Sequence, residues 1–359
     1  MKQLLAAFTL SLCCLMAAAQ GSYAPVTPGH LLRFPEDTGS HPAFRTEWWY
    51  VTGWLSTANG ESLGFQITFF RTKPDIDAGN PSAFTAHQLM IAHCALSDPK
   101  RGRLWQDQRI RRAGLGLAGA DEGNTHAWIE GWMLTRQGDG YVAKISAEDF
   151  ALDLTLSETQ APLINGDAGV SRKGPGAGAA SYYYSLPNMR VAGTVSRKGS
   201  AAKVTGEAWF DHEWSSEYLD AQAGGWDWIG INLNGGGALM AFQIRGLDGK
   251  ALWAGGSLRS TDGTTQILRP GDVAFRPGRR WNSSRTGITY PVEWAVRAGD
   301  REFELKPLFD DQENDTRLST GAIYWEGAVR AFEGAGPAAA QVGRGYLELT
   351  GYGERLHLR

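Results

Sequence analysis

The sequence has little cysteine, no excess of charge of either sign, and no long apolar run beyond one near its start. It has three cysteines among 359 residues, and two of them, Cys13 and Cys14, lie in that run. Removal of the run would leave Cys94 alone, which excludes an intramolecular disulfide. The stability must then come from the hydrophobic core, and a chain of about 340 residues is long enough to form a sufficient one. A net charge of −3 lacks the basic surface that nucleic-acid binding requires, so no nucleic-acid partner is expected.

The first residues have the pattern of an export signal. Lys2 precedes the apolar run from Leu4 to Met16, and three alanines, 17–19, follow it. The run is too short for a transmembrane span, and small residues suit cleavage by a signal peptidase. We expect residues 1–19 to be removed after Ala19 and the product to be periplasmic or secreted.

A lipid anchor is the alternative for this segment. The stretch Leu10-Ser11-Leu12-Cys13 resembles a lipobox, but the bulky Leu12 directly before the cysteine is a poor fit. No later stretch contains the 18 consecutive apolar residues typical of a membrane span. A soluble mature protein is therefore the expectation, and lipoprotein anchoring is the less favoured alternative.

Glycine and tryptophan are abundant, with 46 and 14 residues. Helical periodicity is scarce, and short alternating segments separated by Asn-Gly, Asp-Gly or Gly turns predict strands. The expected strands include 48–56, 63–71, 126–134, 141–146 and 150–156. A Gly/Ala-rich stretch at 165–180 is expected to be a mobile loop. The fold class is therefore predicted to be all-β, a sandwich or barrel.

The chain repeats part of its own pattern. Trp49 precedes Phe65-Gln66-Ile67 by the same spacing by which Trp226 precedes Phe242-Gln243-Ile244. The ends of the two halves, 189–210 and 324–352, also share a strand, a Gly-rich connection and a closing strand. Two copies of one β unit account for both matches. The predicted domains are 20–215 and 216–359.

One short segment concentrates unusual side chains. Asp211-His212-Glu213-Trp214 is followed by Trp226-Asp227-Trp228. On a strand, His212 and Trp214 share one face. An imidazole beside an indole in a water-poor cavity could protonate a double bond or activate water. The alternative is a structural histidine that is hydrogen-bonded to a carboxylate beneath a tryptophan.

The position of this segment at the predicted domain junction favours a ligand site. We expect His212 and Trp214 to line a cavity there, with Trp226 and Trp228 close by. Asp211 or Asp227 would hold the imidazole in one tautomer. His212, Trp214 and Asp211 are the candidate catalytic residues, and Trp226, Asp227 and Trp228 are candidate ligand-binding residues.

The stretch 45–50 is a second candidate. Glu47 and Trp49 share one strand face, and Trp48 lies on the other. Glu47 is either an inward acid in an aromatic pocket or the partner of Arg45 at a barrel rim, where an ion pair contributes little. Glu47, Trp48 and Trp49 are included among the expected ligand-binding residues.

Metal and cofactor sites are not expected. His87 and His93 have the spacing of one strand face, but no third ligand lies near them in sequence and zinc needs three or four. His93 is retained as a candidate ligand-binding residue. A G-x-S-x-G elbow, a P-loop and a dinucleotide fingerprint are all absent from the sequence.

Several long stretches resemble a known family. The sequence is similar to the AttH group of exported proteins, in the superfamily of the carotenoid 1,2-hydratases, to which some fungal pericyclases are also similar. The stretches that carry this resemblance are 36–55, 182–195, 204–219, 226–233 and 343–353.

The resemblance implies two tandem lipocalin-like β-barrels, an apolar ligand and, often, an ABC-transporter operon. It places the catalytic H-x-W pair of the hydratases on His212 and Trp214. The hydratases complete their site with a Tyr-x-Asp pair on a following strand, but the corresponding stretch here, 238–245, has neither residue. This departure puts carotenoid hydration in doubt.

Three functions follow as hypotheses. The first is an exported protein that binds an apolar lipid- or polyene-like molecule and exchanges it with an ABC transporter. The second is a hydratase, hydrolase or cyclase acting on such a molecule, with His212 as acid or base. The third is a structural partner of a transporter, which would need neither His212 nor a lumen.

Overall fold

The structure is a computed structural model that describes residues 23–75, 80, 82, 84–176, 178–334 and 339–355. The predicted all-β class is confirmed. Two large antiparallel sheets contain nearly all of the strands, and the helices of the described residues are short 3-10 turns, η1 (Glu36–Thr38), η2 (Asn234–Gly236) and η3 (Pro270–Asp272). Among these residues, no helix has the length and hydropathy needed to cross a membrane. The predicted signal, 1–19, lies outside them.

The first sheet contains thirteen strands in the order β4-β3-β2-β1-β13-β12-β9-β8-β7-β6-β5, with β10 and β11 also paired to β12. Its strands are β1 (Thr46–Thr57), β2 (Ser62–Thr72), β3 (Leu89–Asp98), β4 (Arg103–Arg112), β5 (Ala118–Ala120), β6 (His126–Ile129), β7 (Trp132–Arg136), β8 (Gly140–Ser146), β9 (Phe150–Ser157), β10 (Leu163–Ile164), β11 (Val170–Arg172), β12 (Ala180–Arg197) and β13 (Ser200–Ser215). Arg109 of β4 donates to the carbonyls of Ile129 and Ser146, so the two ends of the sheet approach each other. The sheet is a nearly closed barrel around one apolar core.

The second sheet contains ten strands in the order β17-β16-β15-β14-β25-β24-β22-β21-β18, with β23 paired to β24. Its strands, together with the separate β19–β20 ribbon, are β14 (Ala223–Leu233), β15 (Ala238–Gly246), β16 (Ala251–Arg259), β17 (Thr265–Leu268), β18 (Val273–Pro277), β19 (Arg280–Asn282), β20 (Thr289–Pro291), β21 (Trp294–Ala298), β22 (Arg301–Pro307), β23 (Glu313–Thr316), β24 (Ala322–Glu333) and β25 (Ala340–Leu349). In both sheets the first strand pairs with the second strand and with the last, so both have one topology.

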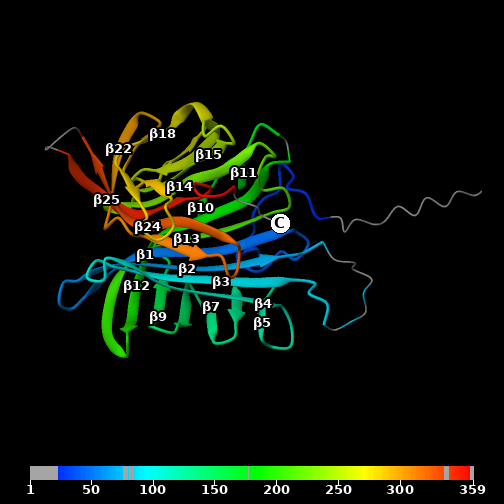
Figure 1. Cartoon of the computed structure of the whole chain (residues 1–359). Coiled ribbons are helices and arrows are strands. Elements are labelled where there is room, and N and C mark those ends of the chain that lie inside the picture. Colours follow the sequence, from blue (N-terminus) through cyan, green and yellow to red (C-terminus); the bar gives the residue numbers. More distant parts are fainter. Residues whose placement is uncertain are drawn as a thin grey trace, which may run out of the picture.

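Strand alternation divides the side chains of β1 and β13 between two environments. Because successive side chains point to opposite faces, Trp49 and His212 point into the first barrel while Trp48 and Asp211 point toward the second sheet. Figure 1 shows the second sheet stacked above β1 and β13, with β5, β7 and β9 below them. The residue pattern of two strands thus supplies both a barrel interior and an interface.

Two details differ from the sequence expectations. Residues 126–134 form a hairpin rather than one strand, because Glu130 adopts a positive φ of 55° and turns the chain between β6 and β7. The stretch 165–180 is not simply a loop. It contains β11, and Lys173 is buried there, 2.7 Å from a carboxylate oxygen of Glu213.

The two sheets are joined by a buried aromatic interface. The indole N–H of Trp54 donates to the Gly345 carbonyl at 3.0 Å, and that of Trp228 donates to the Tyr183 hydroxyl at 3.1 Å. Trp209 and Met240 are buried in the same cluster. Large aromatic side chains contribute much contact area, and each N–H has a partner here. These contacts fix one sheet against the other.

This interface also contains carboxylates in an unfavourable place. Glu326 and Glu348 are direct cross-strand partners on β24 and β25; Glu326 is buried and Glu348 is partly buried. Burial, together with the Glu348 charge, raises the pKa of Glu326 well above its ordinary value. Burial raises the pKa of Glu348 to about 7, and Asp211 and Glu213 add to the rise. The hydroxyls of Tyr50 and Tyr324 face the Glu326 carboxyl and oppose the rise in its pKa without cancelling it.

We expect Glu326→Gln to stabilise the protein, by about 1 kcal/mol or more near pH 8, since each unit of pKa elevation costs about 1.4 kcal/mol. The folded-state pKa is raised, so the cost of the carboxyl grows as pH rises above 4.5. The gain should therefore be smaller near pH 5. Urea unfolding at both pH values measures it. The exposed Glu302→Gln should change little, and a loss of stability in Glu326→Gln at both pH values would contradict the prediction.

Candidate functional site

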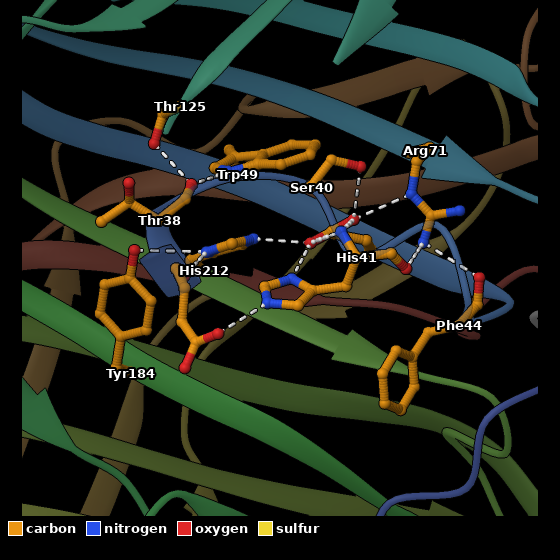
Figure 2. Close-up of polar contacts among 11 residues, drawn as sticks. Thr38, Ser40, His41, Phe44, Trp49, Arg71, Thr125, Tyr184 and His212 are labelled. Carbon is orange, nitrogen blue, oxygen red and sulfur yellow. Dashed lines mark hydrogen bonds and ion pairs between the residues drawn. The ribbon is translucent and has the colours of Figure 1, made fainter. Parts of the chain in front are cut away.

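A buried polar cluster lies at one end of the first barrel, where β1 begins and β13 ends. Glu47 comes from β1, Arg71 from β2, Tyr184 from β12 and His212 from β13. The segment 23–45, which precedes β1, adds further groups and covers this end of the barrel. Figure 2 shows Ser40, His41, Arg71 and His212 around one carboxylate, with Tyr184 bonded to the other side of the His212 ring.

Glu47 is the centre of the cluster and is fully buried. Its Oε1 lies 2.6 Å from Nδ1 of His41 and 2.9 Å from Nε2 of His212. Its Oε2 accepts from Nε of Arg71 at 2.8 Å and from the Ser40 hydroxyl at 3.3 Å. The backbone N–H of His41 also donates to it. Charge-assisted hydrogen bonds of this kind are what allow a carboxylate to stay ionised away from water.

His212 has a partner for each ring nitrogen. Its Nε2 donates to the Glu47 carboxylate, so a neutral ring has an unprotonated Nδ1. The Tyr184 hydroxyl lies 3.2 Å from that nitrogen and can donate to it. The carbonyl of Asp37 lies 3.1 Å away and can accept when Nδ1 carries a proton. The ring is therefore held in one orientation in both protonation states.

His41 is held by two carboxylates. Its Nδ1 bonds to Glu47 and its Nε2 lies 3.2 Å from an oxygen of Asp37. Its ring stacks on the indole of Trp214, with the ring centroids 3.8 Å apart and an angle of 6° between the planes. The His212 ring packs on Trp49 with centroids 4.9 Å apart. Each imidazole thus lies between a carboxylate and a tryptophan face.

The two histidines have opposite acid–base character. Burial lowers the pKa of His41, but Glu47 and Asp37 outweigh burial and raise it to about 9. Burial lowers the pKa of His212, and the positive charge of His41 adds to this against the opposing effect of Glu47. Glu47 itself is buried, yet His41, His212 and Arg71 hold its pKa well below its usual range. At neutral pH the site contains an imidazolium, a neutral imidazole and a carboxylate.

The segment 23–45 closes the barrel over this cluster. Thr27 bonds to the Tyr182 hydroxyl, and the ring of Phe34 packs edge-on against Tyr184. Arg71 donates to the carbonyls of His41 and Phe44, which ties the segment to β2. His212, Glu47 and Arg71 are consequently sealed from solvent in this conformation.

His41, Glu47 and His212 also present three ligand atoms within 4.8 Å of one another. Zinc bonds of about 2.0–2.2 Å in tetrahedral geometry place the ligand atoms about 3.4 Å from one another. The nitrogen–oxygen separations of 2.6 and 2.9 Å here are shorter and are those of direct hydrogen bonds, and Arg71 occupies the other carboxylate oxygen. The donor set fits a proton better than a metal ion.

The structure brings four of the predicted site residues together: His212, Trp214, Glu47 and Trp49. Of the two alternatives for Glu47, the inward position is the one found, and its arginine partner is Arg71 rather than Arg45. The expected carboxylate partner of the imidazole was wrong, because Glu47 rather than Asp211 or Asp227 bonds to it.

The other predicted residues lie elsewhere. Asp211 faces the interface, where Tyr183, Ser185 and Trp209 donate to it. Trp48 and Trp228 belong to that interface, and Trp226 packs against it and donates to Glu348. Asp227 bonds to Gln243, Arg245 and Tyr352 within the second sheet. The expected single cavity shared by His212 and Trp228 is thus two separate environments.

His93 is an interface residue. Its ring bonds to Tyr324 and Ser319 of the second half, and burial lowers its pKa to about 3. His87 is exposed and precedes β3, so the two histidines do not share a strand face as expected. Cys94 is buried as a free thiol.

Four residues of the cluster were not anticipated from the sequence: Asp37, His41, Arg71 and Tyr184. Asp37 and His41 lie in an irregular segment with no strand period, so no pattern assigned them a direction. Arg71 is the direct cross-strand partner of Glu47, and Tyr184 is that of His212. Pairing of β1 with β2 and of β12 with β13 would have identified the last two.

The comparisons with known proteins agree with this architecture. The AttH-like family model matches residues 25–352. A crystal structure described as an AttH candidate from Nitrosomonas europaea is 52% identical, covers 92% of this chain and 99% of its own, and superposes with a TM-score of 0.85. None of the curated proteins matches the chain.

More distant structures share the fold alone. Kievitone hydratase from Nectria haematococca is 14% identical, with a TM-score of 0.69 over 93% of this chain and 97% of its own. CghA, solved with Sch210972, is 13% identical, with a TM-score of 0.51 over 87% and 89%. The match of one family model to nearly the whole described chain, and the close relative at 52% identity, show that this chain belongs to the AttH-like family.

Proposed function

We propose that the protein binds an apolar, unsaturated molecule in the first barrel and catalyses proton transfer on it, by addition or loss of water or by cyclisation. The observation that carries this proposal is the pair of imidazoles on one carboxylate, one protonated and one neutral at neutral pH. Groups whose pKa values are pushed apart by their environment are the usual acid and base of a site.

For hydration, the steps balance without a cofactor. The His41 imidazolium donates its proton to one carbon of a double bond, and the cation that forms lies against the rings of Tyr182 and Tyr184. Water attacks the other carbon and releases its proton to His212. After the product leaves, His212 releases this proton to water and His41 takes one up from water, which restores the starting state, while Glu47 holds His41 Nδ1 and His212 Nε2 in place throughout. Loss of water is the same sequence reversed.

The ligand must enter where residues 23–34 now lie, because His41 belongs to the same segment and has to stay on the Glu47 carboxylate for the chemistry. Thr27 and Phe34 cover Tyr182 and Tyr184. Displacement of residues 23–34 alone would expose an aromatic wall that ends at the cluster of His41, Glu47 and His212. Such a wall suits a polyene or lipid chain.

A carrier without chemistry is the second candidate. It is favoured by the aromatic wall itself, which binds without any need for proton transfer. The proposal for either function includes export, because of the signal-like residues 1–19, and exchange with an ABC transporter, because of the resemblance to the AttH group.

The test begins with native mass spectrometry of the protein purified from the periplasm, which identifies a co-purified ligand. With that ligand, we expect His212→Gln to lower turnover by about 100-fold or more, the usual contribution of general acid–base catalysis. His126→Gln, a change at an exposed histidine of the same barrel, is the control.

The outcomes separate the functions. Loss of turnover with binding kept supports the enzyme, and binding without turnover in the unchanged protein supports the carrier. If His212→Gln folds and leaves both binding and turnover intact, the cluster is structural and the proposal fails.

A further inference from the structure

A basic hollow lies at the end of the first barrel that is remote from His212. It is formed by the turns between β3 and β4, β8 and β9, and β12 and β13, and its volume is about 520 Å³. Its lining residues are Asp98, Lys100, Arg101, Arg103, Trp105, Asp149 and Lys198. A hollow of this size is within the range of small-molecule sites.

Two of the charged lining residues, Asp98 and Lys100, already have partners of opposite charge. Asp98 accepts from Arg197 at 2.8 Å, and Arg197 also donates to Glu61 at 2.9 Å. Lys100 pairs with the other oxygen of Glu61. These four residues form a closed network of two cations and two carboxylates, which leaves none of their charge for a ligand.

Three other cations have no such partner. Among the residues that the structure describes, no hydrogen bond or ion pair joins the side chain of Arg101, Arg103 or Lys198 to a carboxylate. Arg101 lies 3.7 Å above the ring of Trp105, and the Lys198 ammonium lies 5.6 Å from the same ring. Asp149 is the only remaining carboxylate in the lining. The hollow therefore keeps a positive excess on a chain whose net charge is −3.

The backbone holds one of these cations in a costly conformation. Lys198 is the first residue of the two-residue turn Lys198-Gly199 and has a φ of 47°. Tight hairpin turns prefer asparagine or glycine at this position, and other residues there are strained. The Lys198 N–H donates to the Asp149 carbonyl at 2.8 Å, which ties this turn to the β8–β9 turn. The turn is thereby fixed with its lysine at the edge of the hollow.

We propose that this hollow binds a phosphate group through Arg101, Arg103 and Lys198, over the indole of Trp105. Guanidinium groups present paired donors that match phosphate oxygens, and an ammonium adds a point charge. The two possible sources are a soluble phosphorylated molecule and a phospholipid headgroup, which share this chemistry.

The site is independent of the proposed function. β1 runs from the polar cluster at Glu47 to the basic end at Thr57, a distance of roughly 30 Å at the usual strand rise. Figure 1 shows the β1–β2 turn and the N-terminal segment at opposite ends of the barrel. A negative result in the phosphate-binding test therefore does not bear on the function proposed for the His212 cluster, and the reverse also holds.

Two probes distinguish the sources. Inorganic phosphate is titrated by calorimetry, and vesicles of equal parts phosphatidylglycerol and phosphatidylcholine are tested by co-sedimentation, each at low and high salt. We expect the Arg103→Gln/Lys198→Gln double variant to weaken binding by at least tenfold, since each charged hydrogen bond contributes about 1.5–3 kcal/mol. The Lys250→Gln/Arg276→Gln variant, which removes two exposed cations of the second half, is the matched control.

Every outcome bears on the proposal. A soluble ligand is supported if the protein binds inorganic phosphate and the Arg103→Gln/Lys198→Gln variant alone loses this binding. A lipid headgroup is supported if the protein binds only the vesicles and the same variant alone loses that binding. Absence of binding to both probes overturns the proposal. So does binding that the first double variant keeps, or that the control variant loses equally. Both altered side chains are exposed and unpaired, so folding should persist, and circular dichroism confirms it.

Discussion

Glu47→Gln is expected to destabilise the protein by about 3–5 kcal/mol, the cost of leaving buried cations without their carboxylate. The change preserves the shape of the side chain but removes the charge that Arg71 and His41 share. Arg71 is fully buried and has no other carboxylate within salt-bridge distance among the described residues. Urea unfolding followed by tryptophan fluorescence gives the change in free energy of unfolding.

Two further variants make this expectation specific. Glu304→Gln, on a partly exposed strand position of the second sheet, should change stability by less than about 0.5 kcal/mol. Adding Arg71→Met to Glu47→Gln should restore part of the loss, because no unpaired buried arginine remains. If Glu47→Gln is no more destabilising than Glu304→Gln, the buried network contributes little to the fold.

The second large effect is a fall in stability between about pH 6.5 and pH 9 that depends on His41. Its pKa is raised from 6.5 to about 9 in the folded protein, so the folded state binds the proton more tightly than the unfolded state. This stabilisation is complete below pH 6.5 and is lost as pH rises through 9. A difference of about 2.5 in pKa corresponds to about 3 kcal/mol.

His41→Gln isolates this effect, because glutamine does not titrate. The free energy of unfolding of the variant should fall much less across that range than that of the unchanged protein. Asp211 and Glu348, whose pKa values burial raises to about 7, also reduce stability as pH rises, but over roughly pH 4 to 7 and equally in both proteins. Parallel curves above pH 7 would show that His41 is not protonated in the fold.

The fold was largely predictable from local pattern. Alternation and turn residues located β1, β2, β8 and β9, because strand period and Gly turns are encoded within a few residues. The hairpin at Glu130 was missed, since a glutamate with positive φ has no sequence signal. Lys173 was missed because the carboxylate that allows its burial lies on another strand.

The candidate site was predictable only in part. Strand alternation placed His212 with Trp214 and Glu47 with Trp49 on shared faces, and the structure joins these two pairs. It could not indicate which carboxylate meets the imidazole, because that depends on how β1 and β13 pair across more than 160 residues. Nor could it locate His41, whose position depends on an irregular segment folding over a barrel mouth.

The common topology of the two sheets has an evolutionary consequence. Each half has a carboxylate on its first strand bonded to an arginine on its second, Glu47 with Arg71 and Asp227 with Arg245, but the two pairs do not occupy equivalent positions. Arg71 is the direct cross-strand partner of Glu47, whereas Asp227 lies opposite Gln243. A duplicated ancestral gene would account for the shared strand order, and each carboxylate–arginine pair would then have arisen after the duplication. Divergence of the copies would explain why two histidines surround the carboxylate of the first half, while Tyr352 donates to that of the second. With the proposed chemistry in the first half, the second would be free to specialise as its scaffold.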